Sequence, residues 1–343
     1  MGQRTRQLRI LVTGGQGFLG QSLVKALLEL GFENVAATVR REAPEFEDSG
    51  VEVVRVDLTK KKATLAATVN RDVIFHTAAK AGVWGDESLY RAVNVDATEF
   101  LLEGARKNGV SYFIHTSSPS VTFQGRPSLD ENENAPYGFS PFNAYCATKI
   151  ESEKAVLAGH GRLKCLALRP HLIYGPGDPH LLPRVFEAAR SGRLDRIGNG
   201  LNQVDITHVD DAVAAHLCAL FQRELSDIWG RAYFITSGVP VRLWSWLSHV
   251  LSWKKLPRVK RSLSLRRALV IGRWLEKGFR VLGKSSEPPL TEFSALQLGC
   301  DHTYSIESAR RLLGYRPTTN PYQDFDTQLG PRLREWSQFT QLY

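Results

Sequence analysis

The chain has 343 residues, 43% of them apolar and 23% charged, which is enough to bury a large hydrophobic core. Its four cysteines show no paired spacing, so we expect reduced thiols, no disulfide framework and no metal site. The formal charge of +9 is concentrated in residues 254–284, where eleven Lys or Arg residues accompany one acid, Glu276, for a net +10. Basic residues confined to one segment argue against a nucleic-acid-binding protein. No apolar run reaches the ~18 residues that would span a membrane, and a strand beginning at Leu8 leaves no room for a cleavable leader, so we expect a cytoplasmic protein.

The first predicted elements have the order strand, glycine-rich turn, helix. Residues 8–12 form an apolar run typical of a buried strand, and an apolar-periodic helix follows at 21–30. Between them lies T-G-G-Q-G-F-L-G, in which Gly14 and Gly17 let the backbone turn and approach a pyrophosphate, while Gly20 lets the helix pack on the strand. Because the unpaired N–H groups of a helix N-terminus bind phosphate, this turn predicts a dinucleotide site. An ordinary β–α turn is the alternative.

A second strand is predicted at 34–39. An NAD-selective site would place an acidic residue after it to bind the ribose 2′-hydroxyl, and this chain has Arg40 and Arg41 there instead. Two arginines favour the 2′-phosphate of NADP(H) over NAD(H), with solvated loop arginines as the alternative. A third strand at 51–56 leads to Asp57, which could accept from the adenine amino group or cap the next helix.

Two further strands lead into small or hydroxyl residues. The fourth, 72–75, leads into H-T-A-A-K-A-G-V-W-G, whose small residues permit close approach of a cofactor. The fifth, 111–116, ends in T-S-S-P-S-V, which places Ser117 and Ser118 at a carboxyl strand end, where open α/β sheets bind ligands. One of these hydroxyls could hold a substrate carbonyl. Alternatively, both satisfy backbone groups at the strand end.

Tyr145 and Lys149, in N-A-Y-C-A-T-K, are one helical turn apart. This spacing places both on one face of a helix, so the Lys149 ammonium can approach the Tyr145 phenol and favour its ionised form. Moving the pKa of a tyrosine from ~10 toward ~7 needs about 4 kcal/mol, which the lysine and a positively charged nicotinamide could supply. Ordinary solvated helix faces show the same spacing, but downstream of a dinucleotide turn it predicts an oxidoreductase.

Alternating β and α segments predict an α/β fold, a doubly wound parallel sheet of the Rossmann type with a smaller C-terminal substrate lobe. The sixth strand, 164–169, runs into a Pro/Gly-rich exit at which the substrate lobe should begin. Residues 206–211 are expected to return to the first lobe, with Asp210 as the N-cap of a helix at 212–221. The expected NADP-binding domain comprises 1–170 and 203–237, and the expected substrate lobe comprises 171–202 and 238–343.

A basic amphipathic helix is predicted at 265–282. Read at 100° per residue, its narrow polar arc holds Arg266, Arg273, Glu276, Lys277 and Arg280. Its wide apolar arc holds Leu269, Ile271, Trp274, Leu275, Phe279 and Leu282. Such a helix suits peripheral contact with a membrane or the mouth of a hydrophobic substrate cavity. A core helix with a solvated basic face is the alternative.

Five segments together resemble the extended short-chain dehydrogenases/reductases: T-G-G-Q-G-F-L-G, H-T-A-A, T-S-S, Y-C-A-T-K and L-R-P-H-L-I-Y-G-P-G-D. The last, followed by I-G-N-G-L-N-Q-V-D-I-T-H-V-D-D-A, is similar to the 3β-hydroxysteroid dehydrogenase/isomerase family. Within it, A-K-A-G-V-W-G and T-S-S-P-S-V resemble the bacterial 2-alkyl-3-oxoalkanoate reductases of long-chain olefin biosynthesis. The resemblance implies that Tyr145 is the general acid, that Lys149 activates it and binds the ribose, and that Ser118 orients the carbonyl, flanked by Ser117. It also implies that Asn94 supports a proton-relay water, and that the protein is a homodimer.

One residue departs from the sugar-nucleotide epimerases of the same superfamily. That branch usually has Asn three residues before the first Gly of the Y-G-P exit, and this chain has Leu172. An apolar residue there predicts a lipid-like substrate. We therefore expect an NAD(P)H-dependent reductase of the 3-oxo group of a long hydrophobic substrate. The alternatives are a sterol or steroid 3β-hydroxyl dehydrogenase acting in the oxidative direction, and a non-catalytic NADP-binding sensor or scaffold.

The residues expected to contact the cofactor are Gly14, Gly17, Phe18, Leu19, Gly20, Arg40, Arg41, Asp57, Leu58, Ala78, Ala79, Lys80, Tyr145, Lys149 and Pro170.

Overall fold

Seven parallel strands form the sheet of the larger lobe, in the order β12-β7-β5-β4-β1-β2-β3. These strands are β1 (Arg9–Thr13), β2 (Asn34–Val39), β3 (Glu52–Arg55), β4 (Val73–His76), β5 (Tyr112–Thr116), β7 (Lys164–Pro170) and β12 (Ala232–Ile235). The structure, a computed structural model, describes residues 3–46 and 49–323. The strand order reverses between β1 and β4, and doubly wound sheets bind ligands at the carboxyl ends of the strands beside such a reversal. The predicted α/β Rossmann fold is confirmed.

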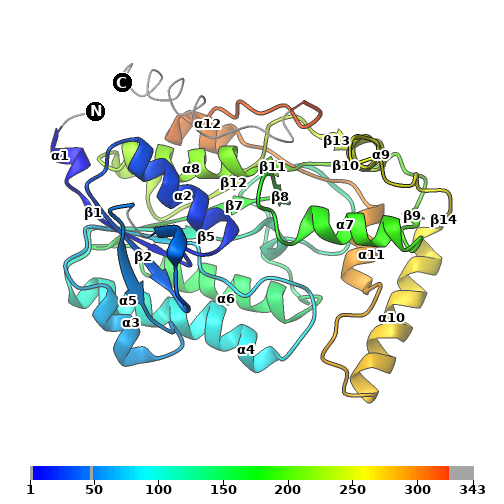
Figure 1. Cartoon of the computed structure of the whole chain (residues 1–343), viewed down its shortest axis with the longest axis horizontal. Helices are drawn as coiled ribbons and strands as arrows, with labels where there is room; N and C mark the ends of the chain where they lie inside the picture. The colour runs from blue at the N-terminus through cyan, green and yellow to red at the C-terminus, as the bar shows by residue number, and fades with distance from the viewer. Residues whose placement is uncertain (1–2, 47–48, 324–343) are drawn as a thin grey trace.

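Helices cover both faces of this sheet (Figure 1). On one face lie α2 (Phe18–Glu29), α8 (Val209–Phe221) and α12 (Glu307–Leu313), and on the other lie α3 (Lys61–Ala67), α5 (Ala97–Lys107) and α6 (Ala144–Ala158). Successive residues of β1 enter opposite cores, since Ile10 and Val12 pack on the α2 side and Leu11 on the α5 side. Burial on both faces explains why the strands are continuous apolar runs in the sequence.

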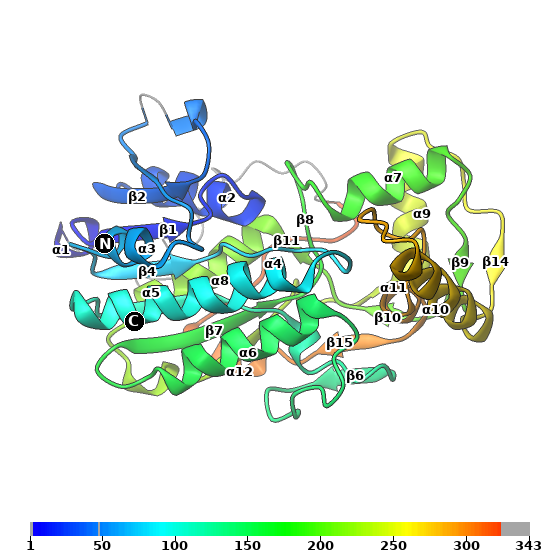
Figure 2. The ribbon, with the colours of Figure 1, turned by 90° about the horizontal axis from the view of Figure 1, so that it is seen from below.

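The smaller lobe is assembled from short strands and helices around a second core that contains Trp244 and Trp246. Its main sheet has the order β13-β10-β15-β6, and two further pairs join β11 to β8 and β14 to β9. These strands are β6 (Ser128–Glu131), β8 (Ile173–Tyr174), β9 (Arg196–Ile197), β10 (Gln203–Val204), β11 (Thr207–His208), β13 (Val241–Arg242), β14 (Ser262–Leu263) and β15 (His302–Tyr304). The helices are α7 (Leu181–Arg190), α9 (Leu243–Trp253), α10 (Leu265–Val281) and α11 (Glu292–Gly299). Figure 2 shows the two lobes side by side, with β8 and β11 between them.

Short helical segments complete the described chain. They are α1 (Gln3–Arg6), α4 (Glu87–Arg91), the π-helical turn η2 (Ala92–Asp96), and the 3-10 turns η1 (Pro44–Phe46), η3 (Pro119–Val121) and η4 (Ser226–Ile228). Within the described ranges, no helix combines the length and the apolar character needed to cross a membrane.

The return between the lobes differs from the sequence prediction at its helix start. Asp210 is not the N-cap, because α8 begins at Val209, one turn earlier than the apolar pattern indicated. His208 caps the helix instead, since its ring Nδ1 accepts from the Asp210 amide at 3.2 Å. Two acidic residues in the first turn remain favourable near the positive end of the helix dipole, which explains why they precede the apolar periodicity.

Two short strands lie in a different lobe from the one that the sequence assigned to them. β6 and β10 fall within the stretches assigned to the NADP-binding domain, yet both pair in the sheet of the smaller lobe. β11 pairs with β8 and not with the large sheet. Residues 324–343, which end the predicted substrate lobe, lie outside the described residues.

Candidate active site

The predicted cofactor contacts follow the sheet in strand order. Beyond the carboxyl ends of β3, β2, β1 and β4 come Asp57 and Leu58, then Arg40 and Arg41, then the glycine turn, and then Ala78 to Lys80. Ser118 follows β5, and Pro170 ends β7. Because neighbouring strands lie about 4.8 Å apart, these residues form one extended row along the edge of the sheet. The topology therefore suits an elongated dinucleotide whose two ends lie several strands apart.

The glycine turn and the loop after β4 approach each other closely at the reversal of strand order. Gly14 has φ +68°, and a Cβ there would lie 2.9 Å from Ala78 Cα. Its amide donates to Thr38 Oγ1 at 2.9 Å, and the Ala78 amide donates to Thr13 Oγ1 at 3.2 Å. A Cβ on Gly20 would collide with the carbonyl oxygen of Gly14. Only glycine fits these contacts, so the backbone of the turn lies directly against the loop after β4 and against the start of α2.

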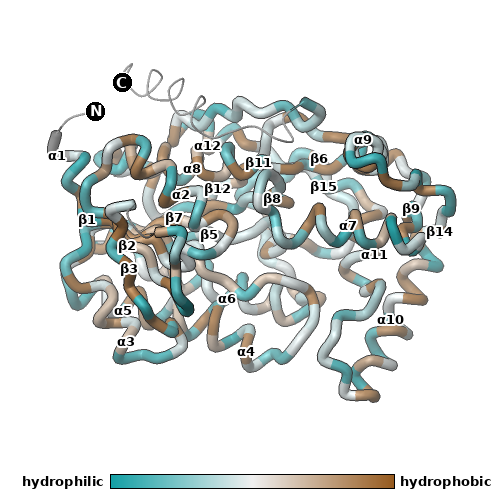
Figure 3. The backbone as a smooth tube through the Cα atoms, in the orientation of Figure 1, coloured by the Kyte–Doolittle hydropathy of each residue, from teal (hydrophilic) through white to brown (hydrophobic). Residues whose placement is uncertain are grey.

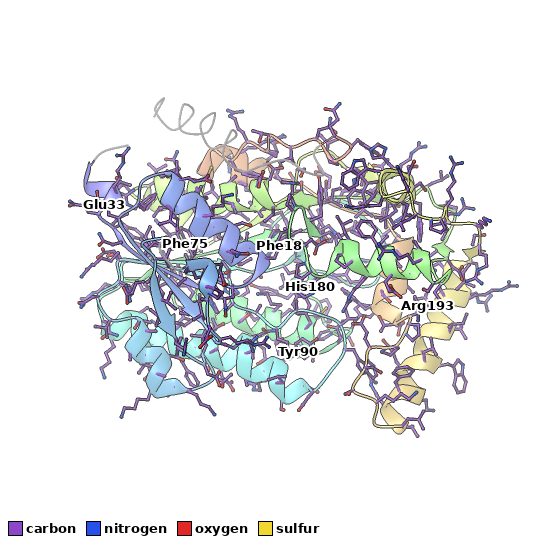
Figure 4. All side chains as sticks on the ribbon, in the orientation of Figure 1. Phe18, Glu33, Phe75, Tyr90, His180 and Arg193 are labelled. Carbon is purple, nitrogen blue, oxygen red and sulfur yellow. The ribbon has the colours of Figure 1, made fainter. Side chains whose placement is uncertain are left out.

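Helix α2 begins directly after this turn. Gly17 is its N-cap, in an extended conformation, and Phe18 and Leu19 form its first residues, as the motif requires. A Cβ on Gly177, in the exit after β8, would lie 3.9 Å from the Phe18 ring. Figure 4 shows Phe18, His180 and Tyr90 where the two lobes meet. The N-terminal end of α2, where the sequence predicts phosphate binding, thus faces the substrate lobe.

Arg40 and Arg41 extend into solvent beside the glycine turn. Gln16 connects the two segments, because its Nε2 donates to the Glu42 carbonyl at 2.7 Å. Asp57 accepts from the Thr59 amide and hydroxyl at 3.0 and 2.8 Å, and these bonds lower the pKa of its carboxyl. From the sequence, Asp57 is either a partner of the adenine amino group or the cap of the next helix. It is not the N-cap of α3, which is Lys60, but its carboxylate forms the turn just before that helix.

Tyr145 and Ser118 bring two hydroxyls together at the carboxyl end of β5. Tyr145 lies in the first turn of α6, which Asn143 caps by accepting from the Cys146 amide at 2.9 Å. Burial raises the pKa of Tyr145 to about 12, and a hydrogen bond with Ser118 opposes this rise. Ser118 also accepts from the Ser120 amide at 3.2 Å, so it both caps η3 and contacts the tyrosine. The flanking Ser117 is buried, and its Oγ has no hydrogen-bond partner within the described chain.

Lys149 is buried below this pair. Its Nζ donates to the Thr116 carbonyl at 2.6 Å. Burial lowers the pKa of Lys149 to about 8, against the attraction of Glu153 one turn later. Because burial raises the pKa of Tyr145, the protein alone keeps its phenol neutral. The expected lowering of this pKa toward ~7 therefore requires the positive charge of a bound nicotinamide. A lysine with a pKa near neutrality can release and regain a proton at working pH.

Asn94 fixes the position of the loop after β4. It lies in the π-helical turn η2, a distortion that is frequent at functional sites. Its side chain accepts from the Lys80 amide at 2.7 Å and donates to the Lys80 carbonyl and to Thr148 Oγ1 at 3.2 and 3.0 Å. Asn94 thereby ties the loop after β4 to α6, the helix that carries Tyr145. Its expected role in holding a relay water stays a prediction.

Two groups around the site were not predicted from the sequence. Glu153 and Arg169 form a buried ion pair, with Nη2–Oε1 at 2.6 Å and Nε–Oε2 at 3.0 Å, and Tyr137 donates to the same carboxylate at 2.9 Å. Tyr90 donates to the Ala81 and Trp84 carbonyls at 3.3 and 3.2 Å and so shapes the loop after β4. The sequence contained one indication of the Glu153–Arg169 pair, because Glu153 lies four residues after Lys149 and therefore on the same face of the helix.

The sequence matches the model of the 3-beta hydroxysteroid dehydrogenase/isomerase family over residues 11–265. The chain belongs to this family. It is 40% identical to a 2-alkyl-3-oxoalkanoate reductase of Stenotrophomonas maltophilia over 314 residues, which cover 90% of this chain and 95% of that protein. A protein of the same name from Shewanella oneidensis is 36% identical, with coverage of 89% and 81%. Mouse sterol-4-alpha-carboxylate 3-dehydrogenase, decarboxylating, is 33% identical, with coverage of 89% and 86%.

Solved structures share the fold over nearly the whole chain. MoeE5 in complex with UDP-glucose and NAD is 25% identical with a TM-score of 0.69, covering 96% of this chain and 99% of that one. UDP-glucuronic acid 4-epimerase from Bacillus cereus, in complex with NAD, is 24% identical with a TM-score of 0.68 and coverage of 95% and 99%. The N-terminus of α2, where the N-cap Gly17 makes no side-chain hydrogen bond to the first amides, fits the diphosphate of such a dinucleotide. The chain is an NAD(P)-dependent oxidoreductase that binds a nicotinamide cofactor.

Proposed function

We propose that this enzyme reduces the 3-oxo group of a long hydrophobic 2-alkyl-3-oxoalkanoate to a 3-hydroxyl, with NADPH as the reductant. The observation that carries the proposal is the contact between Ser118 and Tyr145 at the carboxyl end of β5, above the buried Lys149. Two hydroxyls so placed bind one carbonyl oxygen, and 40% identity to a 2-alkyl-3-oxoalkanoate reductase supports that substrate class.

The residues divide the chemistry as follows. The nicotinamide, when bound, supplies a hydride to the carbonyl carbon. Ser118 donates a hydrogen bond to the carbonyl oxygen, and Tyr145 transfers its proton to that oxygen as negative charge develops. Lys149, whose pKa burial lowers to about 8, stabilises the resulting phenolate and returns a proton to it. The carbonyl thus gains one hydride and one proton and becomes an alcohol, and oxidation runs through the same groups in reverse.

The preference for NADPH rests on Arg40 and Arg41. Both guanidinium groups are exposed beyond β2, next to a turn that Gln16 fastens to Glu42. A 2′-phosphate reaching this point would find two cations and charge-assisted hydrogen bonds. NADH offers no group that would use them.

The hydrophobic character of the substrate is argued from Leu172. This residue lies at the exit from β7, has φ +41°, and packs against the core of the smaller lobe. Its carbonyl accepts from the Thr207 amide at 3.3 Å, which holds the exit in place. An isobutyl side chain cannot bind a diphosphate, so we assign an acyl chain rather than a nucleotide sugar to this lobe.

The test is NADPH oxidation by the purified protein with a 2-alkyl-3-oxoalkanoic acid, run beside a 3-oxosteroid and repeated with NADH. Consumption of NADPH with the oxo acid supports the proposal. Turnover of the steroid alone would contradict the substrate class, and faster turnover with NADH would contradict the cofactor preference.

The second candidate is oxidation of a sterol 3β-hydroxyl, which 33% identity to the mouse sterol dehydrogenase favours. It uses the same groups, so NADP⁺ or NAD⁺ reduction with a 4-carboxysterol distinguishes it. The homodimer implied by the family resemblance is a further proposal, which light scattering tests. A non-catalytic sensor or scaffold does not fit the assembled Ser118, Tyr145 and Lys149.

A further inference from the structure

Helix α10 carries apolar residues on two opposite faces. Its inner face packs on α11, where a Cβ on Gly272 would lie 2.8 Å from the Thr291 backbone. Ala268 and Gly272 are buried there, and Leu265, Leu269, Leu275 and Phe279 are partly buried. The inner face therefore accounts for the attachment of the helix to its lobe. It does not account for the remaining apolar side chains.

The outer face of α10 is an exposed apolar strip. Val270, Trp274 and Val281 lie within a narrow arc at 100° per residue and are 50%, 70% and 80% exposed. Ile271 and Leu282 border this arc and are exposed as well. The apolar arc expected from sequence is thus divided, with Ile271, Trp274 and Leu282 outside and the other members inside. Figure 3 shows the alternating hydropathy along this helix. An exposed apolar strip that includes a tryptophan of which 70% is exposed indicates a surface that contacts another molecule.

Cations border this strip while the acids point away from it. Arg266, Arg267 and Lys277 have no acidic partner among the described residues. Glu276, the one acid of residues 254–284, accepts from the Glu292 amide at 3.2 Å on the inner side, and Glu292 pairs with Arg273. The strip therefore carries positive charge along its margins without compensation. That arrangement repels a second copy of the same face and attracts an anionic surface.

The C-terminal end of α10 reaches the loop after β4, residues 77–86. Trp84 Nε1 donates to the Lys284 carbonyl at 3.2 Å, and the Arg280 guanidinium lies 5.5 Å from the centre of the Trp84 ring. Trp84 belongs to the same loop as Ala78, which touches the glycine turn. The exposed helix therefore ends against the loop after β4, the same loop that contacts the glycine turn.

We propose that the outer face of α10 docks the enzyme on an anionic lipid surface, with Trp274 and its apolar neighbours in the interface and the flanking cations on the headgroups. Interfacial helices combine these features, an apolar strip with Trp and a basic margin. Docking places the contact between α10 and the Trp84 loop next to the lipid surface, from which a hydrophobic substrate could reach the proposed site. The proposal that α10 binds lipid does not depend on the proposed reaction. Only the suggestion that docking brings the substrate to the enzyme rests on the proposed function.

The test is flotation of the purified full chain with phosphatidylcholine vesicles and with vesicles containing 30% phosphatidylglycerol, at low and high salt. We expect binding to the anionic vesicles only, weakened by salt. The double variant Arg266→Glu, Lys277→Glu should lower the partition coefficient at least tenfold, since each cation near a bilayer contributes substantially. Trp274→Gln should lower it severalfold.

The matched controls lie on the other lobe and on another exposed apolar site. Lys62→Glu, Lys107→Glu changes the charge equally on α3 and α5, and Leu129→Gln removes an exposed leucine from β6. Both should bind vesicles as the natural chain does. Equal weakening by the controls, equal binding to neutral vesicles, or no binding would overturn the proposal, as would a change of oligomeric state in Trp274→Gln. NADPH turnover with a short, soluble 3-oxo acid shows separately that each variant is folded and active.

Discussion

The hydroxyl of Tyr145 is protonated in the structure, because burial raises its pKa to about 12, and the hydrogen bond with Ser118 lowers the pKa only in part. The residues that we propose touch the reacting atoms were accessible from sequence for a simple reason. Tyr145 and Lys149 are local neighbours on one helix, and Ser118 stands at a predictable strand end. What sequence could not show is that the Lys149 ammonium contacts the Thr116 carbonyl, since the two come from different elements.

Tyr145→Phe removes the proton donor while keeping the ring in place. We expect kcat to fall by ~10²- to 10⁴-fold, the usual contribution of a positioned acid, with the affinity for NADPH nearly unchanged. Stopped-flow or steady-state kinetics together with a cofactor titration measure both quantities. A variant with kcat within twofold of the natural chain would exclude the assigned role.

Replacing Arg40 and Arg41 together with Ala should raise KM for NADPH by about 10- to 100-fold, because a charge-assisted hydrogen bond contributes roughly 1.5–3 kcal/mol. KM for NADH should stay the same, since its ribose carries no 2′-phosphate. Lys62→Ala, an exposed cation on α3, is the control. Equal loss with both cofactors would mean that the arginines act on the fold and not on the phosphate.

At the scale of single elements, α6 explains how one short segment serves several purposes. Tyr145 reaches the site, Thr148 meets Asn94, Lys149 meets β5, and Glu153 meets Arg169 on β7. Helical periodicity predicted the shared face but not the Arg169 contact, because the partner lies on a separate strand 16 residues along the chain. The same limit applies to β6 and β10, short strands whose pairing with the smaller lobe leaves no local pattern.

Glu153→Gln tests the buried pair. It leaves the Arg169 guanidinium buried beside a neutral group, so the free energy of unfolding should fall by about 3–5 kcal/mol. Urea denaturation measures the loss. Adding Arg169→Met to the same variant should restore much of the stability, because no uncompensated charge then remains. If the double variant is the less stable of the two, the pairing is not what the substitution disturbs.

The whole molecule carries an unusual load of buried neutral imidazoles. Burial lowers the pKa of His76 to about 3 and those of His216 and His302 to about 4, and it holds the pKa values of His115 and His171 well below the usual 6.5. They lie in both lobes, and His171 contacts His302 at 2.7 Å across the junction. Their titration therefore couples the stability of the two lobes to pH.

The sign of this dependence follows from proton uptake. Well above pH 6.5 these histidines are neutral in both the folded and the unfolded chain. As the pH decreases through about 6.5, the unfolded chain binds protons that the folded chain does not bind. The free energy of unfolding therefore decreases as the pH decreases. Each contributes at most about 1.4 kcal/mol per pH unit. Asp205 opposes them, since burial raises its pKa to about 6 and its folded form takes up a proton earlier. We expect a net loss of several kcal/mol between pH 7.5 and 5.5 by urea denaturation, and a flat profile would contradict the buried neutral state.

Leu172 links substrate choice to backbone geometry in a way that matters for engineering. Its φ of +41° is a conformation that costs most L-residues about 1–2 kcal/mol and that asparagine tolerates. Leu172→Asn would relieve this strain but would also remove a leucine that packs against the core of the smaller lobe, so its two effects on stability oppose each other. Leu172→Gly relieves the strain as well and adds no polar group, so comparing the two variants separates the backbone from the side chain. In both, turnover of long-chain substrates should fall relative to short ones, and a screen for heat resistance alone would not reveal that loss.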